Sequence, residues 1–276
     1  MKNGEWVIQE QHAGNAFGKQ APVFDQLYGP DKIVQYKRKR VRDHVEQLIK
    51  PGSAILEINA GTGEDAVYFA QQGHQVHSTD ISAGMLQILV RKVAEQGLSG
   101  RVTHELCSYT NLESLHHQGP YDYIFSNFAG LNCTGSIEKV LSSFALLTKP
   151  GGYVTLVILP RFCLWESLLM FRGKFRTAFR RWAGKKGAKA KVEGMPFRCW
   201  YYNPSRIIRA LHNDFDKIAL DGLCTLVPPS YLEQFAEKHP RWMNRLIRWE
   251  QQLKSKWPWR SIGDYYIISL QRKKLS

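Results

Sequence analysis

The segment from Glu57 to Gly63, which reads Glu-Ile-Asn-Ala-Gly-Thr-Gly, has the residue types of a loop that binds a nucleotide-like ligand. Glycines let a ligand approach the backbone closely. A helix that begins directly after such a loop offers unpaired N–H groups and the positive end of its dipole. Asp80 follows 23 residues after Glu57, near the spacing at which a carboxylate reaches ribose hydroxyls. These residues therefore predict a ligand that carries a ribose.

The loop can do this only if a strand precedes it and a helix follows it. The run 54–58 is short and apolar, as in a buried strand, and residues 64–72 have apolar positions at helical spacing. Gly73 is suited to end that helix, and residues 74–79 predict a second strand. Asp80-Ile81-Ser82 then opens a long helix that ends near Gly97. A βαβα unit is therefore predicted by residue 97.

The same alternation continues along the chain. A helix is predicted before the first strand, at 31–50, and another at 136–147; further strands are predicted at 101–107, 121–126, 153–159, 215–220 and 264–270. Strands that alternate with helices form a parallel sheet joined by right-handed crossovers. We therefore expect an α/β fold with a doubly wound, mainly parallel sheet and helices on both of its faces.

Four segments in order resemble the class I S-adenosylmethionine-dependent methyltransferases: LEINAGTGEDA, HQVHSTDISAGML, YDYIFSNFAGLN and LLTKPGGYVTLVIL. The resemblance spans residues 54–159 and implies a Rossmann-like, seven-stranded sheet, S-adenosylmethionine as cofactor and an enzyme of the EC 2.1.1 class. It also implies a set of cofactor-binding residues. Around the methionine part these are Glu57, Asn59, Ala60, Gly61 and Gly63; at the ribose Asp80; at the adenine Ile81, Met85, Cys107 and Ser108; and below the sulfonium Asn127 and Phe128.

Two positions depart from the family pattern. Asn59 stands where a glycine is common, and asparagine is the side chain that best tolerates positive φ, so we expect the loop to keep its shape. Ser108 stands where an acidic residue often contacts the adenine amino group, so that contact is not predicted. An NAD-dependent dehydrogenase is the nearest alternative, but Glu64 and Asp65 place negative charge where a pyrophosphate would bind.

The acceptor site is expected in segments outside this core. We predict that residues 1–50 form an N-terminal helical segment covering the cofactor site and that 51–276 form the methyltransferase domain, with 161–203 and 228–260 as insertions forming a substrate cap. Residues 164–182 predict a basic amphipathic helix, interpreted as a helix packed on its own domain, a lid or a membrane-contacting surface. The substrate-binding candidates are His12, Tyr28, Trp165, Tyr201 and Tyr202.

Charge and cysteine content limit the partners and the kinds of site that we expect for this protein. The chain has 276 residues and a formal net charge of +14, concentrated in 161–200, where eleven Lys and Arg face two Glu, and in 32–42. Such patches suit nucleic acid, an anionic membrane surface or an acidic substrate. Five cysteines without a CxxC pair predict neither a disulfide framework nor a metal site.

The sequence therefore predicts a cytoplasmic enzyme that methylates oxygen, nitrogen or carbon of a small hydrophobic or acidic metabolite. Methyl transfer needs orientation and exclusion of water more than a dedicated base, so no catalytic residue is predicted. Three alternatives stay open. They are an RNA methyltransferase that uses the basic insertion, a membrane-surface enzyme acting on a lipid-like substrate with peripheral contact to anionic lipid, and a non-catalytic protein that binds S-adenosylmethionine. The oligomeric state is not predicted.

Overall fold

Seven strands form one sheet in the spatial order β3-β2-β1-β4-β5-β9-β8. Their bounds are β1 Ala54–Ile58, β2 Gln75–Asp80, β3 Val102–Leu106, β4 Tyr121–Ser126, β5 Thr148–Ile158, β8 Phe215–Leu223 and β9 Tyr265–Arg272. Strands β1 to β5 are parallel, whereas β9 runs antiparallel to both β5 and β8. The predicted fold class, a mainly parallel seven-stranded α/β sheet, is confirmed. This computed structural model describes residues 3–173 and 175–274.

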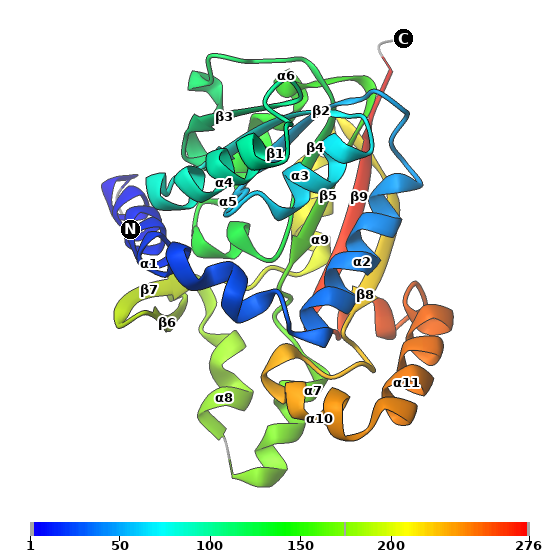
Figure 1. Ribbon diagram of the computed structural model, residues 1–276. Helices are drawn as coiled ribbons and strands as arrows, with labels where there is room; N and C mark the ends of the chain where they lie inside the picture. Colours follow the sequence, from blue (N-terminus) through cyan, green and yellow to red (C-terminus); the bar gives the residue numbers. More distant parts are fainter. Residues whose placement is uncertain (1–2, 174, 275–276) are drawn as a thin grey trace.

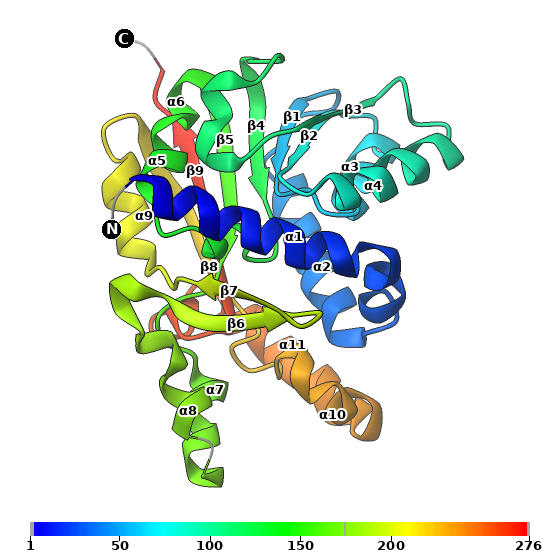
Figure 2. The same cartoon turned by 90° about the vertical axis from the view of Figure 1, so that its left-hand side faces the viewer.

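Helices cover both faces of the sheet (Figures 1 and 2). Tyr123 and Phe125 pack against one group of helices, whereas Ile124, between them in β4, packs against the other group. This alternation is what a parallel sheet buried on both faces requires. The first face carries α2 Lys32–Glu46, α3 Glu64–Gln71 and α4 Ala83–Glu95; the second carries α5 Ile137–Ser142, α6 Phe144–Leu147 and α9 Pro204–Leu211.

The N-terminal helix α1, Asn3–Tyr28, lies across the carboxyl ends of the strands (Figure 2). It packs on α4 and on a β-hairpin formed by β6 Ala188–Val192 and β7 Met195–Cys199. Phe17 of α1 meets Phe197 of the hairpin with ring centroids 5.7 Å apart. This hairpin was not predicted from the sequence, because its strands are only five residues each and β6 alternates alanine with lysine. It supports α1 from the side away from the sheet.

The prediction of one continuous amphipathic helix over residues 164–182 is wrong. The structure has α7 Leu164–Leu168, a 3-10 turn η3 at Leu169–Arg172, α8 Phe175–Phe179 and a 3-10 turn η4 at Arg180–Trp182. Gly173 has φ +70°, a left-handed conformation that ends a helix. A further 3-10 turn, η6 Ser230–Leu232, precedes helices α10 Glu233–Lys238 and α11 Pro240–Leu253 in the second insertion.

Candidate functional site

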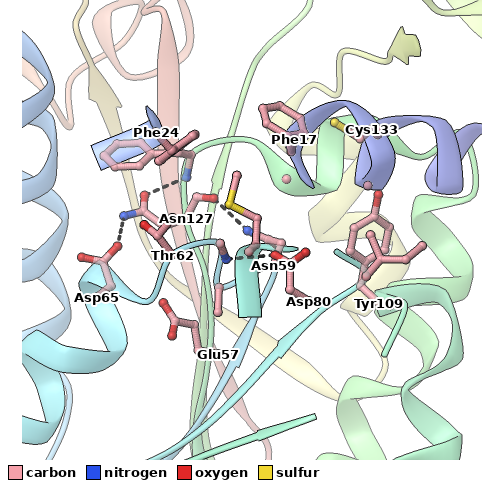
Figure 3. A pocket seen from close by; sticks show the side chains of 18 of the residues that line it. Phe17, Phe24, Glu57, Asn59, Thr62, Asp65, Asp80, Tyr109, Asn127 and Cys133 are labelled. Carbon is pink, nitrogen blue, oxygen red and sulfur yellow. Dashed lines mark hydrogen bonds between the residues drawn. The ribbon is translucent and has the colours of Figure 1, made fainter. Parts of the chain in front are cut away.

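A cavity lies where β1, β2 and β4 end, between the glycine loop and α1 (Figure 3). Parallel strands place their carboxyl ends and the loops after them at one edge of a sheet, which is where ligands bind in open α/β folds. Phe17 and Phe24 of α1 face the loop from the opposite side of the cavity. The remaining lining residues are Glu10, Ala13, Gly14, Arg38, Glu57, Asn59, Ala60, Gly61, Thr62, Glu64, Asp65, Asp80, Ile81, Met85, Tyr109, Asn127, Phe128, Gly130 and Cys133.

The glycine loop turns through three residues with positive φ: Asn59 at +53°, Gly61 at +58° and Gly63 at +78°. Asn59 adopts this conformation as the sequence predicted, and its side chain adds two bonds that a glycine could not make. Its amide nitrogen donates to the carbonyl oxygen of Asn127 at 2.9 Å, and its amide oxygen accepts from Ser126 Oγ at 2.6 Å. Asn59 therefore ties the loop after β1 to the end of β4.

Asp80, at the end of β2, holds the glycine loop and the start of α4 together. One carboxylate oxygen accepts from the backbone N–H of Gly61 at 2.9 Å, and the other accepts from Ser82 N–H at 2.8 Å. Burial raises the pKa of Asp80, although these backbone donors act in the opposite direction. Each carboxylate oxygen has two lone pairs, so both can still accept a hydroxyl proton from a ligand.

Glu57 lies in the floor of the cavity with 2% of its surface exposed. It accepts a hydrogen bond from Ser78 Oγ at 2.9 Å. Burial, followed by the negative charge of Asp65, raises the pKa of Glu57 to about 8. A buried carboxyl group of this kind gains most from a ligand that brings a positive charge. The floor of the cavity therefore suits a cationic ligand group.

Asn127 is fixed from the side of α3. Its amide nitrogen donates to Asp65 Oδ2 at 2.7 Å, and Arg42 Nε donates to Asp65 Oδ1 at 2.7 Å. The guanidinium of Arg42 also lies 4.2 Å from the ring centroid of Tyr68. Arg42 thus compensates the charge of Asp65, and the carboxylate serves to orient Asn127 beside the glycine loop.

Helix α1 is joined to the sheet by a buried carboxylate at its cavity side. Glu10, 1% exposed, accepts from Ser108 Oγ at 2.6 Å, from Thr110 Oγ1 at 2.7 Å and from Thr134 Oγ1 at 2.7 Å. Helix α1 also packs closely on the start of α4, because a Cβ at Gly14 would lie 2.8 Å from a side-chain carbon of Ile81, and a Cβ at Gly84 would lie 3.0 Å from the carbonyl oxygen of Gly18. The cover over the cavity is therefore held by both polar bonds and close packing.

Nine of the twelve predicted cofactor-binding residues line this cavity, and their binding role stays a prediction. Gly63 lies behind the loop, where a Cβ would come within 2.5 Å of Leu89. Cys107 and Ser108 line a shallow neighbouring hollow with Ile81. Ser108 is nevertheless bonded to the cavity through Glu10, so an acidic group does stand beside this position, contributed by α1.

The predicted substrate-binding residues do not gather around the cavity. His12 is exposed on α1, and Tyr28 lines an adjoining cavity with Arg38 and Arg42. Tyr202 is buried in the main core, where its hydroxyl donates to the carbonyl oxygen of Thr134. The remaining two, Trp165 and Tyr201, lie within the insertion 161–203. Neither insertion contributes a lining residue to the main cavity, whose cover in the described part of the chain is α1.

Sequence reasoning missed residues of α1 and α2 that line the cavity, chiefly Glu10, Phe17, Phe24 and Arg38. Arg38 lies 3.5 Å from Glu64 Oε2, with its guanidinium 5.4 Å from the ring centroid of Phe128. The sequence patterns that could have indicated these residues were weak. The small residues at 13, 14, 16 and 18 suggest a helix that packs closely on another, and Arg38 belongs to the basic run 32–42. Neither pattern indicates which residue faces the ligand.

Comparison with known proteins agrees with this geometry. Residues 55–152 match a family described as a methyltransferase domain. The chain is also 30% identical over 149 residues to a demethylmenaquinone methyltransferase of Symbiobacterium thermophilum, which covers 52% of this chain and 57% of that protein. The chain thus spans little more than half the length of this curated relative.

Solved structures share the fold across nearly the whole chain. The [4+2]-cyclase SpnF superimposes with a TM-score of 0.63 and 16% identity, covering 97% of this chain and 98% of SpnF. The 1,6-didemethyltoxoflavin-N1-methyltransferase of Burkholderia thailandensis, solved with S-adenosylhomocysteine, gives a TM-score of 0.57 and 14% identity. The match covers 100% of this chain and 92% of that enzyme.

Residues 55–152 therefore form a methyltransferase domain. The cofactor that the comparisons support for this domain is S-adenosylmethionine. The polar residues of the cavity fit that molecule. The buried Glu57 offers a partner for its ammonium group, Arg38 for its carboxylate, and Asp80 at the end of β2 for its ribose hydroxyls. Fold alone does not fix the reaction, as the likeness to a cyclase illustrates.

Proposed function

We propose that this methyltransferase transfers the methyl group of S-adenosylmethionine to a small hydrophobic acceptor. The observation that carries the proposal is the apolar wall that α1 adds opposite the glycine loop, with Phe17, Phe24 and Ala13 lining the cavity. Apolar walls with few polar groups are typical of sites for hydrophobic small molecules. The name of the Symbiobacterium thermophilum relative specifies demethylmenaquinone as its acceptor, which supports the same class.

The cofactor-binding roles follow from charge and position. Asp80 would accept the ribose hydroxyls, Glu57 would neutralise the ammonium and sulfonium charges, and Arg38 would hold the carboxylate. Asn127 and Phe128 would bound the reacting end, with Asn127 oriented by Asp65. Bound S-adenosylmethionine supplies a methyl group activated by its positively charged sulfur.

The residues of the chain then act by orientation and exclusion of water. Helix α1 closes the cavity, and Glu10 fixes α1 against the loops after β3 and β4 through three hydroxyl groups. The thiol of Cys133 has its pKa raised well above the ordinary value by burial. It therefore stays protonated at neutral pH, and the proposal assigns it no role in methyl transfer.

The test is transfer of label from methyl-tritiated S-adenosylmethionine to acceptors. The purified chain is incubated with an organic extract of membrane lipids and quinones, with water-soluble metabolites, and with bulk tRNA in separate reactions. The proposal predicts that label appears in the organic extract. Label only in tRNA or in water-soluble products would contradict it, as would cofactor binding without any label transfer.

A matched pair of variants tests the apolar wall. Phe24→Ser removes an aromatic side chain that lines the cavity, whereas Leu27→Ser changes an exposed residue of the same helix. Phe24→Ser should raise the KM for the acceptor by about tenfold, as for loss of one well-buried apolar contact, and leave the affinity for S-adenosylhomocysteine within about twofold. Leu27→Ser should change neither. Equal effects of both variants would remove the support for a hydrophobic acceptor.

A further inference from the structure

Two parts of the chain project from the end of the molecule at which the parallel strands finish (Figures 1 and 2). The first projection comprises residues 161–186 and contains α7 and α8. The second comprises residues 230–257 and contains α10 and α11. No helix in the described part of the chain is both long and apolar enough to cross a membrane.

The first projection exposes the apolar side chains of the predicted amphipathic helix, although they lie on α7, η3, α8 and η4 and not on one helix. Phe171, Phe175, Phe179 and Trp182 are 83%, 57%, 48% and 62% exposed, and Leu168 is 44% exposed. A helix packed on its own domain would bury these side chains and expose its charges. Here the apolar side chains are in solvent, so packing against the chain's own core does not explain them.

Charged residues of the same segment point inward instead. Arg181 is 2% exposed and donates to Glu166 Oε1 at 2.6 Å, to Asp264 Oδ1 at 2.7 Å and to the carbonyl oxygen of Pro160 at 3.2 Å. Glu166 is 1% exposed and also accepts two bonds from Arg180. Burying ions is costly unless they are paired in this way. The network anchors the base of the first projection to Asp264, directly before β9, and leaves its aromatic side chains outward.

The second projection has the same arrangement. Trp242 and Trp249 lie on α11 seven positions apart and are 50% and 49% exposed, with Arg245 between them, its guanidinium 5.2 Å from the Trp242 ring centroid. Glu250 of the same helix is 1% exposed and accepts backbone N–H groups from residues 224–227, at 2.9 to 3.0 Å. Trp257, after the helix, is 78% exposed.

Two longer stretches that contain the projections, residues 161–200 and 228–260, hold nearly all of the chain's net charge. Residues 161–200 contain eleven Lys and Arg against two Glu, and residues 228–260 contain seven against three, within a chain of formal charge +14. The rest of the sequence is close to neutral. Exposed Phe, Leu and Trp surrounded by Arg and Lys are the composition with which proteins bind the interface of an anionic bilayer.

We propose that the two projections form a docking surface for an anionic phospholipid bilayer, with the aromatic side chains inserted among the headgroups and the basic residues against lipid phosphates. The aromatic side chains and Leu168 lie on a segment that projects from the molecule (Figures 1 and 2), whereas single-stranded RNA is bound along a basic groove, so we favour lipid over RNA. Docking by itself does not require methyl transfer. That a bilayer delivers the acceptor rests on the proposed function.

A short path of contacts connects this surface to the cavity. Lys37 of α2, 4% exposed, donates to Ser230 Oγ at 2.6 Å at the base of the second projection. The same Nζ lies 5.7 Å from the ring centroid of Phe128, which lines the cavity, and 4.9 Å from that of Tyr265. The second projection is therefore attached directly behind the wall of the cofactor site.

Vesicle flotation tests the proposal. The full chain is mixed with vesicles of phosphatidylcholine alone or with 30% phosphatidylglycerol. We expect flotation with the anionic vesicles, at least about tenfold stronger than with neutral ones, and a marked loss in 0.5 M NaCl because added salt screens the basic residues. Failure of the wild-type chain to float with anionic vesicles, or equal binding to both kinds, would overturn the proposal.

Surface variants locate the contact. Phe171→Ser with Phe175→Ser, and separately Trp242→Ser with Trp249→Ser, should each weaken flotation by at least about tenfold. Leu146→Ser is the matched control, because Leu146 is 77% exposed on α6 at the opposite end of the molecule, and it should float like the wild type (Figure 1). Unchanged flotation of both double variants would refute the assignment.

Two further measurements on the same variants separate the alternatives. The wild-type chain could bind bulk RNA and no vesicles, and both double variants could lose the RNA binding. That result would assign the surface to nucleic acid and overturn the proposal. Calorimetry with S-adenosylhomocysteine should give wild-type affinity for every variant, because none of these side chains lines the cavity. Lost flotation with intact cofactor affinity supports docking whether or not the proposed acceptor is correct.

Discussion

The buried carboxyl group of Glu57 makes the stability of the protein depend on pH in a direction that one substitution can test. Its pKa is about 8 in the folded chain, raised by burial and by Asp65, against an ordinary value of 4.5. Between these two pH values the carboxyl group of Glu57 is ionised in the unfolded chain and protonated in the folded chain. The folded chain therefore binds more protons, and stability falls as pH rises.

The size of the effect follows from the pKa difference. Each pH unit within the window costs about 1.4 kcal/mol, and the full difference corresponds to roughly 5 kcal/mol. This stabilising contribution is complete below about pH 4.5 and is lost as pH rises through about 8. Glu57→Gln removes the titration while its amide oxygen can still accept the hydrogen bond from Ser78 Oγ.

Urea unfolding of both proteins at pH 6, 7 and 8 measures the difference. All other titrating groups are shared, so their contributions cancel when the free energy of unfolding of Glu57→Gln is subtracted from that of the wild type. We expect this difference to fall by about 1.4 kcal/mol per pH unit between pH 6 and 7, and to fall less steeply above pH 7.5. Parallel pH profiles would refute the reasoning that Glu57 is protonated in the free protein.

The same group links cofactor binding to proton release. If cationic groups of S-adenosylmethionine bind over Glu57, they lower its pKa, and a carboxyl group with a pKa of about 8 then loses about 0.9 proton at pH 7. Calorimetry in two buffers with different ionisation enthalpies counts this proton. Glu57→Gln should release none, and equal release by both proteins would place the cofactor's positive charges elsewhere.

Three further substitutions test the packing around the cavity. Gly63→Ala should lower the free energy of unfolding by about 2–4 kcal/mol in urea titrations, because φ is +78° and the new Cβ would lie 2.5 Å from a side-chain carbon of α4. Gly73→Ala, with φ +93° and open space, should lose only about 1–2 kcal/mol, and equal losses would contradict the packing argument. Gly14→Val should displace α1 and raise the Kd for S-adenosylhomocysteine by about tenfold in calorimetry, whereas Gly100→Val, whose Cβ meets nothing within 4 Å, should not. Arg181→Met should cost about 3–5 kcal/mol in urea unfolding, because Asp264 loses its bond from Arg181 and the buried Glu166 keeps only Arg180; a cost under about 1 kcal/mol would contradict this.

The cofactor half of the fold could be predicted because its signals are local. The apolar run before Glu57, the glycines after it and Asp80 at the next strand end lie within one βαβ unit, where short-range spacing determines position. The conformation of Asn59 was predictable for the same reason, since asparagine tolerates positive φ. Its bonds to Ser126 and Asn127 were not, because they join residues 67 and 68 positions apart.

The arrangement of the segments outside this βαβ unit could not be predicted in the same way. Helical spacing indicates that Phe171, Phe175 and Phe179 share a face, but it does not say whether that face is buried or exposed. The answer depends on Arg181 and Asp264, which are 83 positions apart and pair only in the folded chain. Glu10 is a comparable case, because its three hydroxyl partners come from the loops after β3 and β4.

The central claim is that the glycine loop and Asp80 bind S-adenosylmethionine. Isothermal titration calorimetry with S-adenosylhomocysteine tests it most directly, on the wild type, on Asp80→Ala and on Asp216→Ala, an exposed aspartate of β8 that serves as the matched control. We predict one site per chain, with binding about 10- to 100-fold weaker in Asp80→Ala, equivalent to about 1.4–2.7 kcal/mol, and unchanged in Asp216→Ala. No binding by the wild type, or equal affinity of wild type and Asp80→Ala, would contradict the claim.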